Sequence, residues 1–116
     1  MWQVEEEPEV HRWILGLDDA DYVEVEARID RLAELGSQLR RPHTASLGDG
    51  LFELRFRLGR VAWRIPFWFA PGRVIVLLTV FRKQRMNERN EVARARHAMK
   101  ICAERHTKES DNDNLD

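Results

Sequence analysis

The stretch LGDGLFELRFRLGRVAWRIPFWFAPGRVIVLLTVFRK, which runs from Leu47 to Lys83, decides the fold of this chain. Residues 52–57 and 61–69 alternate between apolar and other side chains, which is the pattern of strands with one buried face. Residues 73–81 are apolar almost throughout, as expected of a central strand that is covered on both faces. Turn residues separate the segments: Asp49–Gly50, Gly59 and Pro71–Gly72. The stretch therefore predicts three consecutive strands joined by tight turns.

The alternation also predicts which side chains of the first two strands face the core. The inward set comprises Phe52, Leu54, Phe56, Val61, Trp63, Ile65, Phe67 and Phe69. Pro66 has no N–H to donate to a sheet, so we expect a bulge or a partly free edge at that position. Trp68 points to the other side, where it either stacks on a nucleic-acid base or packs under a helix, and packing is the favoured interpretation.

Cationic side chains occupy many of the remaining positions. They are Arg55, Arg57, Arg64, Arg82 and Lys83, without a matching number of carboxylates. A guanidinium binds a phosphate through paired hydrogen bonds, and converging cations stabilise the extra charge of a phosphoryl transition state. RNA carries its own nucleophile, the 2′-hydroxyl. The set therefore indicates a surface that binds or cleaves RNA. The alternative is that Glu53 pairs with Arg55 or Arg57 and that the other cations are solvated.

The formal net charge of −1 conceals a strong segregation of charge along the chain. Residues 1–36 hold three Arg or Lys against eleven Asp or Glu, whereas residues 37–108 hold sixteen against five. A balanced total would argue against a nucleic-acid partner, but a segregated one does not. The alternative is that acidic helices and basic strands cover different faces for solubility.

Helical patterns precede the strands. Residues 1–4 suit a short first strand. Apolar side chains then recur at helical spacing over residues 10–17 and 22–35, with a break at Gly16 and a capping pair at Asp18–Asp19. These residues predict a helical hairpin that ends at Gly36.

Three further segments complete the chain. Residues 39–46 read as a loop. A thin apolar stripe over residues 87–106 predicts a C-terminal helix that packs lightly or leaves room for a partner. Residues 109–116 are acidic and polar, and we expect them to be a disordered tail. Residues 1–108 are expected to form a single domain.

Several classes of protein are disfavoured by composition. The lone Cys102 excludes an internal disulfide and fits a reducing compartment. No basic, apolar leader and no apolar run long enough to span a membrane is present, so we expect a cytoplasmic protein. The four histidines are scattered, and no zinc spacing occurs, so we expect neither a metal nor a cofactor. The GDG of residues 48–50 is a hairpin turn, since it lacks the pattern of a phosphate-binding loop.

Three motifs in this order resemble a known family. GDGLFELRF, the WRI of the next strand and VIVLLTVFRK before a helix are similar to the RelE/HigB superfamily of bacterial toxins. The similarity is greatest to its phage-derived host-growth-inhibitor, HigB-like branch, and it covers roughly residues 47–103. The resemblance implies an α+β fold in which an N-terminal helical hairpin packs on a small antiparallel sheet of three to five strands, followed by a C-terminal helix.

The resemblance also implies a function. It implies the toxin of a type II toxin–antitoxin system, a metal-independent endoribonuclease that cleaves mRNA, commonly on the ribosome, and thereby inhibits translation. A partner antitoxin, often a helix-turn-helix protein, would cover the basic face. Arg55, Arg64 and Lys83 match the family's catalytic positions. Arg57, Arg82 and Arg85 form the supporting RNA-binding set.

The chain departs from the family pattern at three places. Gln84 replaces a second Lys, the usual Pro before the last helix is absent, and the one tyrosine, Tyr22, lies in an early helix. No general base is therefore assigned; His97 or His106 would titrate in the right range, but each is better explained as a surface histidine. The alternatives that remain are a ribonuclease independent of ribosomes and a non-catalytic module that binds RNA, an antitoxin or a chaperone.

Overall fold

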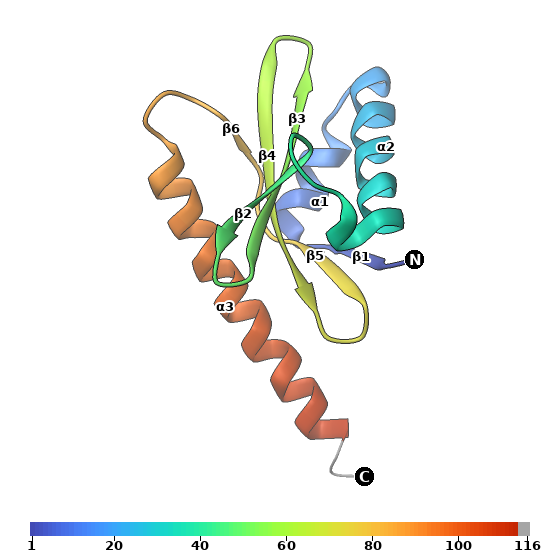
Figure 1. Cartoon of the computed structure of the whole chain (residues 1–116), viewed down its shortest axis with the longest axis vertical. Helices are drawn as coiled ribbons and strands as arrows, with labels where there is room; N and C mark the ends of the chain where they lie inside the picture. Colours follow the sequence, from blue (N-terminus) through green and yellow to red (C-terminus); the bar gives the residue numbers. More distant parts are fainter. Residues whose placement is uncertain (114–116) are drawn as a thin grey trace.

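The computed structural model describes residues 1–113, in which one mixed sheet lies between two layers of helix (Figure 1). The sheet has six strands in the order β1-β5-β4-β3-β2, and β6 pairs with β4 beyond the end of β5. The strands are β1 (Gln3–Glu6), β2 (Thr44–Gly48), β3 (Leu51–Leu58), β4 (Val61–Ala70), β5 (Val74–Leu77) and β6 (Phe81–Arg82). The helices are α1 (Pro8–Leu15), α2 (Asp19–Leu35) and α3 (Glu88–Asp113), with a 3-10 turn, η1 (Gly36–Gln38), after α2.

The predicted three-strand unit is confirmed as β3, β4 and β5, which pair antiparallel in chain order. The inward set is confirmed except for Val61, since its other members belong to the core cluster beneath α1 and α2 or pack against it. Val61, at the start of β4, instead lines a surface pocket. A further hairpin precedes this unit, because β2 pairs antiparallel with β3 across the turn at Asp49–Gly50. Both turn residues have positive φ, as the type I′ turn of a two-residue hairpin requires.

The loop predicted over residues 39–46 is wrong at its end, because β2 begins at Thr44. Thr44 and Ala45 are buried, and they pair with Leu54 and Glu53 of β3. The segment has no alternating pattern of its own. It becomes a strand because its backbone pairs with the edge of β3.

Pro66 stands inside β4 without a bulge, directly opposite Glu53 of β3. On its other side the β5 ladder stops at Phe67 and the β6 ladder starts at Arg64. Pro66 therefore occupies the gap between two ladders, where its carbonyl accepts a hydrogen bond from the Leu78 N–H at 2.8 Å. The missing N–H costs no ladder hydrogen bond there. The expected bulge is wrong, but the expected break in pairing is confirmed.

The apolar run 73–81 is not one strand. β5 leaves the ladder after Leu77, and the chain returns to β4 as β6. Between them, the Val80 N–H donates to Glu9 Oε2 of α1 at 2.9 Å. A side chain from the helical layer thus replaces the missing strand partner, which no local pattern predicts.

The short first strand expected over residues 1–4 is present as β1, but its pairing overturns part of the predicted architecture. β1 precedes the helical hairpin and brings the sheet to six strands, beyond the three to five predicted. It pairs parallel with β5, so the prediction of a purely antiparallel sheet is wrong at this edge. The helical hairpin and the strands that follow it separate β1 from β5, and such a long crossover is what parallel pairing requires.

The helical hairpin itself is confirmed in α1 and α2, which cover one face of the sheet (Figure 1). The Asp18 side chain caps α2 by accepting a hydrogen bond from the Asp21 N–H at 2.8 Å. Val10, Val25 and Leu32 bury their side chains against the sheet. None of the helices in residues 1–113 is long and apolar enough to cross a bilayer.

The C-terminal helix α3 covers the other face and extends beyond the predicted end at His106 to Asp113. Its Ala95 and Cys102 pack on the sheet, and the Trp68 Nε1–H donates to Cys102 Sγ at 3.4 Å. Trp68 therefore packs under a helix, as favoured. Of the tail predicted to be disordered, residues 109–113 continue the helix, and residues 114–116 lie outside the described residues.

Two ion pairs fasten α3 to the N-terminal segment. Arg94 donates hydrogen bonds to both carboxylate oxygens of Glu9, and Arg105 donates to Glu7. Burial opposes ionisation of the Glu9 carboxyl, but the hydrogen bonds from Arg94 and the Val80 N–H outweigh it and lower the pKa of Glu9. The same pairing raises the pKa of Arg94.

This clamp predicts a pH-dependent contribution to stability. Because the pKa of Glu9 is lower in the folded chain, its contribution is present above the pKa of an unfolded glutamate and is lost as the pH falls through the folded value. We expect Glu9→Gln to lower the free energy of unfolding by about 1 kcal/mol at pH 7, since the pair is partly exposed and water screens it. The difference should shrink as the pH falls below about 4.

Urea denaturation at about pH 7 and about pH 3.5 measures both effects, because these values lie above and below the pKa of an unfolded glutamate, about 4. Glu5→Gln is the control, because Glu5 is exposed on β1. A Glu9→Gln penalty that is independent of pH would contradict the assignment.

Candidate functional site

A buried carboxylate between two arginines marks the face of the sheet opposite the helical hairpin. Arg55 of β3 and Arg64 of β4 stand directly opposite one another. Glu53 is 3% exposed; its Oε1 lies 3.2 Å from Arg55 Nη2, and its Oε2 lies 3.7 Å from Arg64 Nε. The predicted alternative, pairing of Glu53 with Arg55, is therefore present. One carboxylate nevertheless faces two guanidinium groups, so the cluster keeps a positive excess.

Arg64 is the most enclosed cation of the cluster, at 8% exposure. Burial lowers the pKa of Arg64, the Glu53 carboxylate opposes this, and Arg55 adds to it by like-charge repulsion. Its Nη1 donates to the Trp63 carbonyl at 3.1 Å. Among the described residues, the Nε groups of both Arg55 and Arg64 lack a hydrogen-bond acceptor although they are buried. Buried donors without acceptors are costly, so Glu53 alone satisfies the two guanidinium groups only in part.

Lys83 is held beside this pair by its backbone. Its N–H donates to the Ala62 carbonyl at 2.8 Å, immediately after the short β6 ladder on β4. Its Nζ lies 3.7 Å from Glu88 Oε1, and both side chains are half exposed. Such an exposed pair is weak, so the ammonium group remains available to a ligand.

The three residues predicted to be catalytic line one pocket of about 460 Å³, which also contains Arg57. A second pocket, of about 350 Å³, is lined by Arg82 and Arg85 and shares Arg57 and Lys83 with the first. We call the two together the basic groove. The structure thus brings together all six residues of the predicted catalytic and RNA-binding sets; their roles remain predictions.

The groove has no acidic lining among the described residues. It lies at the end of the sheet where the β3–β4 hairpin projects past the start of α3 (Figure 1). Within residues 1–113, no cluster of three or more His, Cys, Asp or Glu side chains is placed to hold a metal ion. The arrangement can bind and polarise an anionic ester through fixed cations.

Sequence reasoning missed three residues of the groove: Arg28 of α2, His43 before β2, and Arg60 in the β3–β4 turn. Arg28 also pairs with Glu24 one helical turn away, at 2.9 Å. His43 is tied to the site because its carbonyl accepts from the Arg55 N–H at 2.8 Å. Since that bond depends on where β2 starts, no sequence pattern marks His43.

The two histidines considered from the sequence lie elsewhere. His106 packs edge-on against Trp68, with ring centroids 5.8 Å apart, and His97 lines a different pocket beside α1. Neither lines the basic groove.

Residues 12–101 match a family described as "Phage derived protein Gp49-like (DUF891)". The chain belongs to this family. The match includes the basic groove residues from Arg28 to Arg85 and most of α3. A search of curated proteins finds no match.

Solved structures show that the fold is RelE-like. A chain in the crystal structure of the intact E. coli RelBE toxin–antitoxin complex matches with a TM-score of 0.55 at 9% identity, over 73% of this chain and 100% of that one. The isolated E. coli RelE toxin gives 0.55 at 10% identity, over 80% and 96%. A double arginine-to-alanine mutant of E. coli RelE in the free state gives 0.56 at 10% identity, over 79% and 90%. The resemblance read from the sequence is confirmed for a phage-derived family with this fold, while the HigB-like branch stays a prediction.

The cluster of Glu53, Arg55 and Arg64 predicts a non-additive effect of substitutions on stability. We expect Glu53→Gln to lower the free energy of unfolding by about 2–4 kcal/mol, because it leaves two like charges close together in a partly dehydrated site. Combining it with Arg64→Met should cost less than the sum of the single changes, since the repulsion disappears.

Urea denaturation of the single and double variants tests this expectation. Arg57→Gln is the matched control on the same strand face; as an exposed residue it should change stability by no more than about 0.5 kcal/mol. Additive losses in the double variant would contradict the coupling.

Proposed function

We propose that this chain is the toxin of a type II toxin–antitoxin system and that it cleaves mRNA, most effectively on the ribosome. The observation that carries the proposal is the basic groove, in which the guanidinium groups of Arg55 and Arg64 and the ammonium group of Lys83 lie close together. The one buried carboxylate beside them, Glu53, does not balance their charge. The RelE-like fold and the phage-derived family support it. The HigB-like branch is part of the same proposal.

The proposed reaction is an internal transesterification. The 2′-oxygen attacks the adjacent phosphorus, the bond to the 5′-oxygen of the next nucleotide breaks, and a 2′,3′-cyclic phosphate remains. Arg55 and Arg64 bind the phosphate oxygens and stabilise the charge that develops on them. Lys83, whose ammonium group is weakly paired with Glu88, would stabilise the leaving 5′-oxygen and donate the proton that completes the 5′-hydroxyl. Holding the bound strand in an in-line geometry supplies much of the remaining rate enhancement.

The reaction also needs an acceptor for the 2′-hydroxyl proton, and we propose His43 for that role. Among the residues that line the basic groove, His43 is the one whose side-chain type changes charge between pH 5 and 8. The charged groups that face it are Arg28 from α2, Arg55 and Arg57 from β3, Arg64 from β4, and Lys83.

A partner antitoxin is expected to inhibit the toxin by laying carboxylates over the basic groove. Such a partner, of the helix-turn-helix class, would meet five cations in one pocket. Charge complementarity of this kind increases the rate of association and the specificity of the complex.

The first functional test is primer extension on cellular mRNA after brief induction of the chain. Wild type should produce discrete cleavage sites within translated codons and arrest growth. Arg64→Lys and Lys83→Met should each lose most of the cleavage, because a lysine cannot reproduce the paired hydrogen bonds of a guanidinium and a methionine carries no charge.

The matched control is Lys100→Met, an exposed position on α3 outside the groove. Circular dichroism checks that each variant folds. Folded Arg64→Lys and Lys83→Met proteins that still cleave would refute the catalytic assignment. Salt-sensitive RNA binding without cleavage in any condition would identify a non-catalytic module. Cleavage of a naked transcript without ribosomes would identify the ribosome-independent alternative.

The second functional test concerns the proton acceptor. His43→Gln should lower kcat by about 100-fold and weaken the dependence of the rate on pH, as expected on loss of a general base. Single-turnover cleavage at a series of pH values measures both. His97→Gln is the control, since His97 lies outside the groove. An unchanged pH profile in His43→Gln would exclude His43 as the base.

A further inference from the structure

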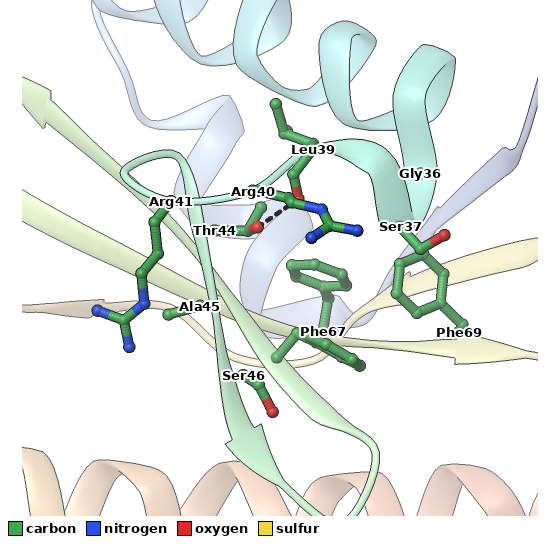
Figure 2. A pocket seen from close by; sticks show the side chains of 11 residues that line it. Gly36, Ser37, Leu39, Arg40, Arg41, Thr44, Ala45, Ser46, Phe67 and Phe69 are labelled. Carbon is green, nitrogen blue, oxygen red and sulfur yellow. Dashed lines mark hydrogen bonds between the residues drawn. The ribbon is translucent and has the colours of Figure 1, made fainter.

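A second concave site lies on the other side of the segment that carries His43. Its floor consists of aromatic rings from β3 and β4, and its rim carries hydroxyl and guanidinium groups (Figure 2). The floor residues are Phe52, Phe67 and Phe69, and the rim residues are Ser37, Arg40, Arg41 and Ser46. The cavity has a volume of about 220 Å³. We call it the aromatic pocket.

The pocket exists because the helical layer ends early. α2 stops at Gly36, which has a φ of 55° and packs so closely against Trp2 that a Cβ there would lie 2.2 Å from the indole nitrogen. The chain then turns away and is tied back where the Thr44 hydroxyl donates to the Leu39 carbonyl at 2.6 Å (Figure 2). Neither helix therefore covers this end of the aromatic surface. The aromatic rings at this end of the sheet are left uncovered because of the backbone path that follows α2.

The rings of the floor pack against one another, and Phe69 stands nearly perpendicular to the stacked pair of Phe52 and Phe67. Phe52 and Phe67 stack with ring centroids 5.8 Å apart, and Phe69 meets Phe52 edge-on at 5.3 Å. Phe67 is buried, whereas Phe52 and Phe69 keep partly exposed rings. Aromatic platforms of this kind bind planar ligands, since stacking needs no further reorganisation.

The rim selects for negative charge. Arg40 and Arg41 are exposed, and neither makes an ion pair with another described residue. Figure 2 shows the Arg40 guanidinium above the aromatic floor, while Arg41 points outward past Ala45. No acidic side chain lines the pocket in the described part of the chain. The ligand that fits is thus a planar ring with an anionic group close by.

The same short segment forms a wall of both sites. Arg40 and Arg41 line the aromatic pocket, and the next two residues, Pro42 and His43, line the basic groove. An RNA strand with one phosphate in the groove would carry its neighbouring nucleotide towards this wall. Each phosphate of RNA is followed by a base. In the same way, the cations of the basic groove and the aromatic rings of the pocket lie on the two sides of residues 40–43.

We infer that the aromatic pocket is a nucleobase subsite, which holds the base of a nucleotide flanking the cleaved phosphate while Arg40 or Arg41 contacts its phosphate. This inference rests on the proposed function and adds a specificity-determining contact to it. The cavity is below the roughly 300–1,000 Å³ of sites for drug-sized ligands, so it suits one heterocyclic ring. An acidic peptide with one bulky apolar residue has similar chemistry, and the experiments below distinguish it from a nucleotide.

The test is NMR of the ¹⁵N-labelled chain with two small probes, uridine 5′-monophosphate and ribose 5-phosphate. The nucleotide should shift the backbone amides of Ser37, Ala45 and Ser46, whereas the sugar phosphate, which has no base, should shift them far less. Both probes should shift the amides of Arg55 and Arg64 in the basic groove. Equal shifts of the pocket amides by the two probes would overturn the inference.

A filled pocket provides the matched comparison. Ser37→Phe places a ring at the rim and should abolish the nucleotide shifts at Ala45 and Ser46 while the groove still responds. Gln38→Phe, at the next residue of η1, is exposed but does not line the pocket, so it should leave both responses intact. Nucleotide shifts that persist in Ser37→Phe would refute the subsite.

Two measurements separate this inference from the proposed function. Binding of a 2′-O-methyl oligonucleotide, which cannot be cleaved, should weaken about tenfold in Ser37→Phe, the typical worth of one stacked base. If cleavage is never found but the nucleotide still binds the pocket selectively, the proposed function fails and the subsite stands. If an Asp-Phe-Asp peptide shifts the pocket amides and the nucleotide does not, the pocket is a protein-docking site and the subsite is refuted.

Discussion

The antiparallel pairing of β3 with β4 is the constraint on which the rest of the structure depends. Its register runs from Phe52 opposite Phe67 to Leu58 opposite Val61. Because side chains alternate along a strand, this register sends apolar side chains such as Leu54, Phe56 and Ile65 beneath α1 and α2. It leaves Arg55 and Arg64 together on the opposite face. A slip by one residue would exchange the two faces and destroy the core and the cationic pair at once.

The sheet face that carries the arginines has two parts: α3 covers one, and the basic groove occupies the other. α3 covers the part around Trp68 and Cys102, where the side chains are apolar. It is fastened there by ion pairs to Glu7 and Glu9, residues that flank the start of α1. The end of the sheet that carries Arg55 and Arg64 is left for the basic groove. The buried carboxylate of Glu53 reduces the repulsion between the two arginines. A positive excess remains, which a phosphate would neutralise.

Local patterns were sufficient wherever the interaction partner lay nearby in the chain. The alternation in β3 and β4, the Asp18 cap and the helical spacing of α2 all report on neighbours within a few residues, and all are confirmed. The six basic residues of the predicted site could be found in the same way, because they lie on adjacent strands or directly after them. Patterns failed for β2, for the break after β5 and for the parallel pairing of β1, because a distant strand or the Glu9 side chain provides the partner there.

By itself, the sequence determined the central strands, the helical hairpin and the cationic positions, since each depends on periodicity or on residue type. Tertiary structure alone decided that Leu39 to His43 would separate a basic groove from an aromatic pocket, and that His43 would stand among five cations. The reason is physical: an unpatterned segment takes its conformation from the edges and helix ends to which it is anchored. Here those anchors are the Arg55 N–H of β3 and the Thr44 hydroxyl of β2, which donate to the His43 and Leu39 carbonyls and whose positions the sheet sets.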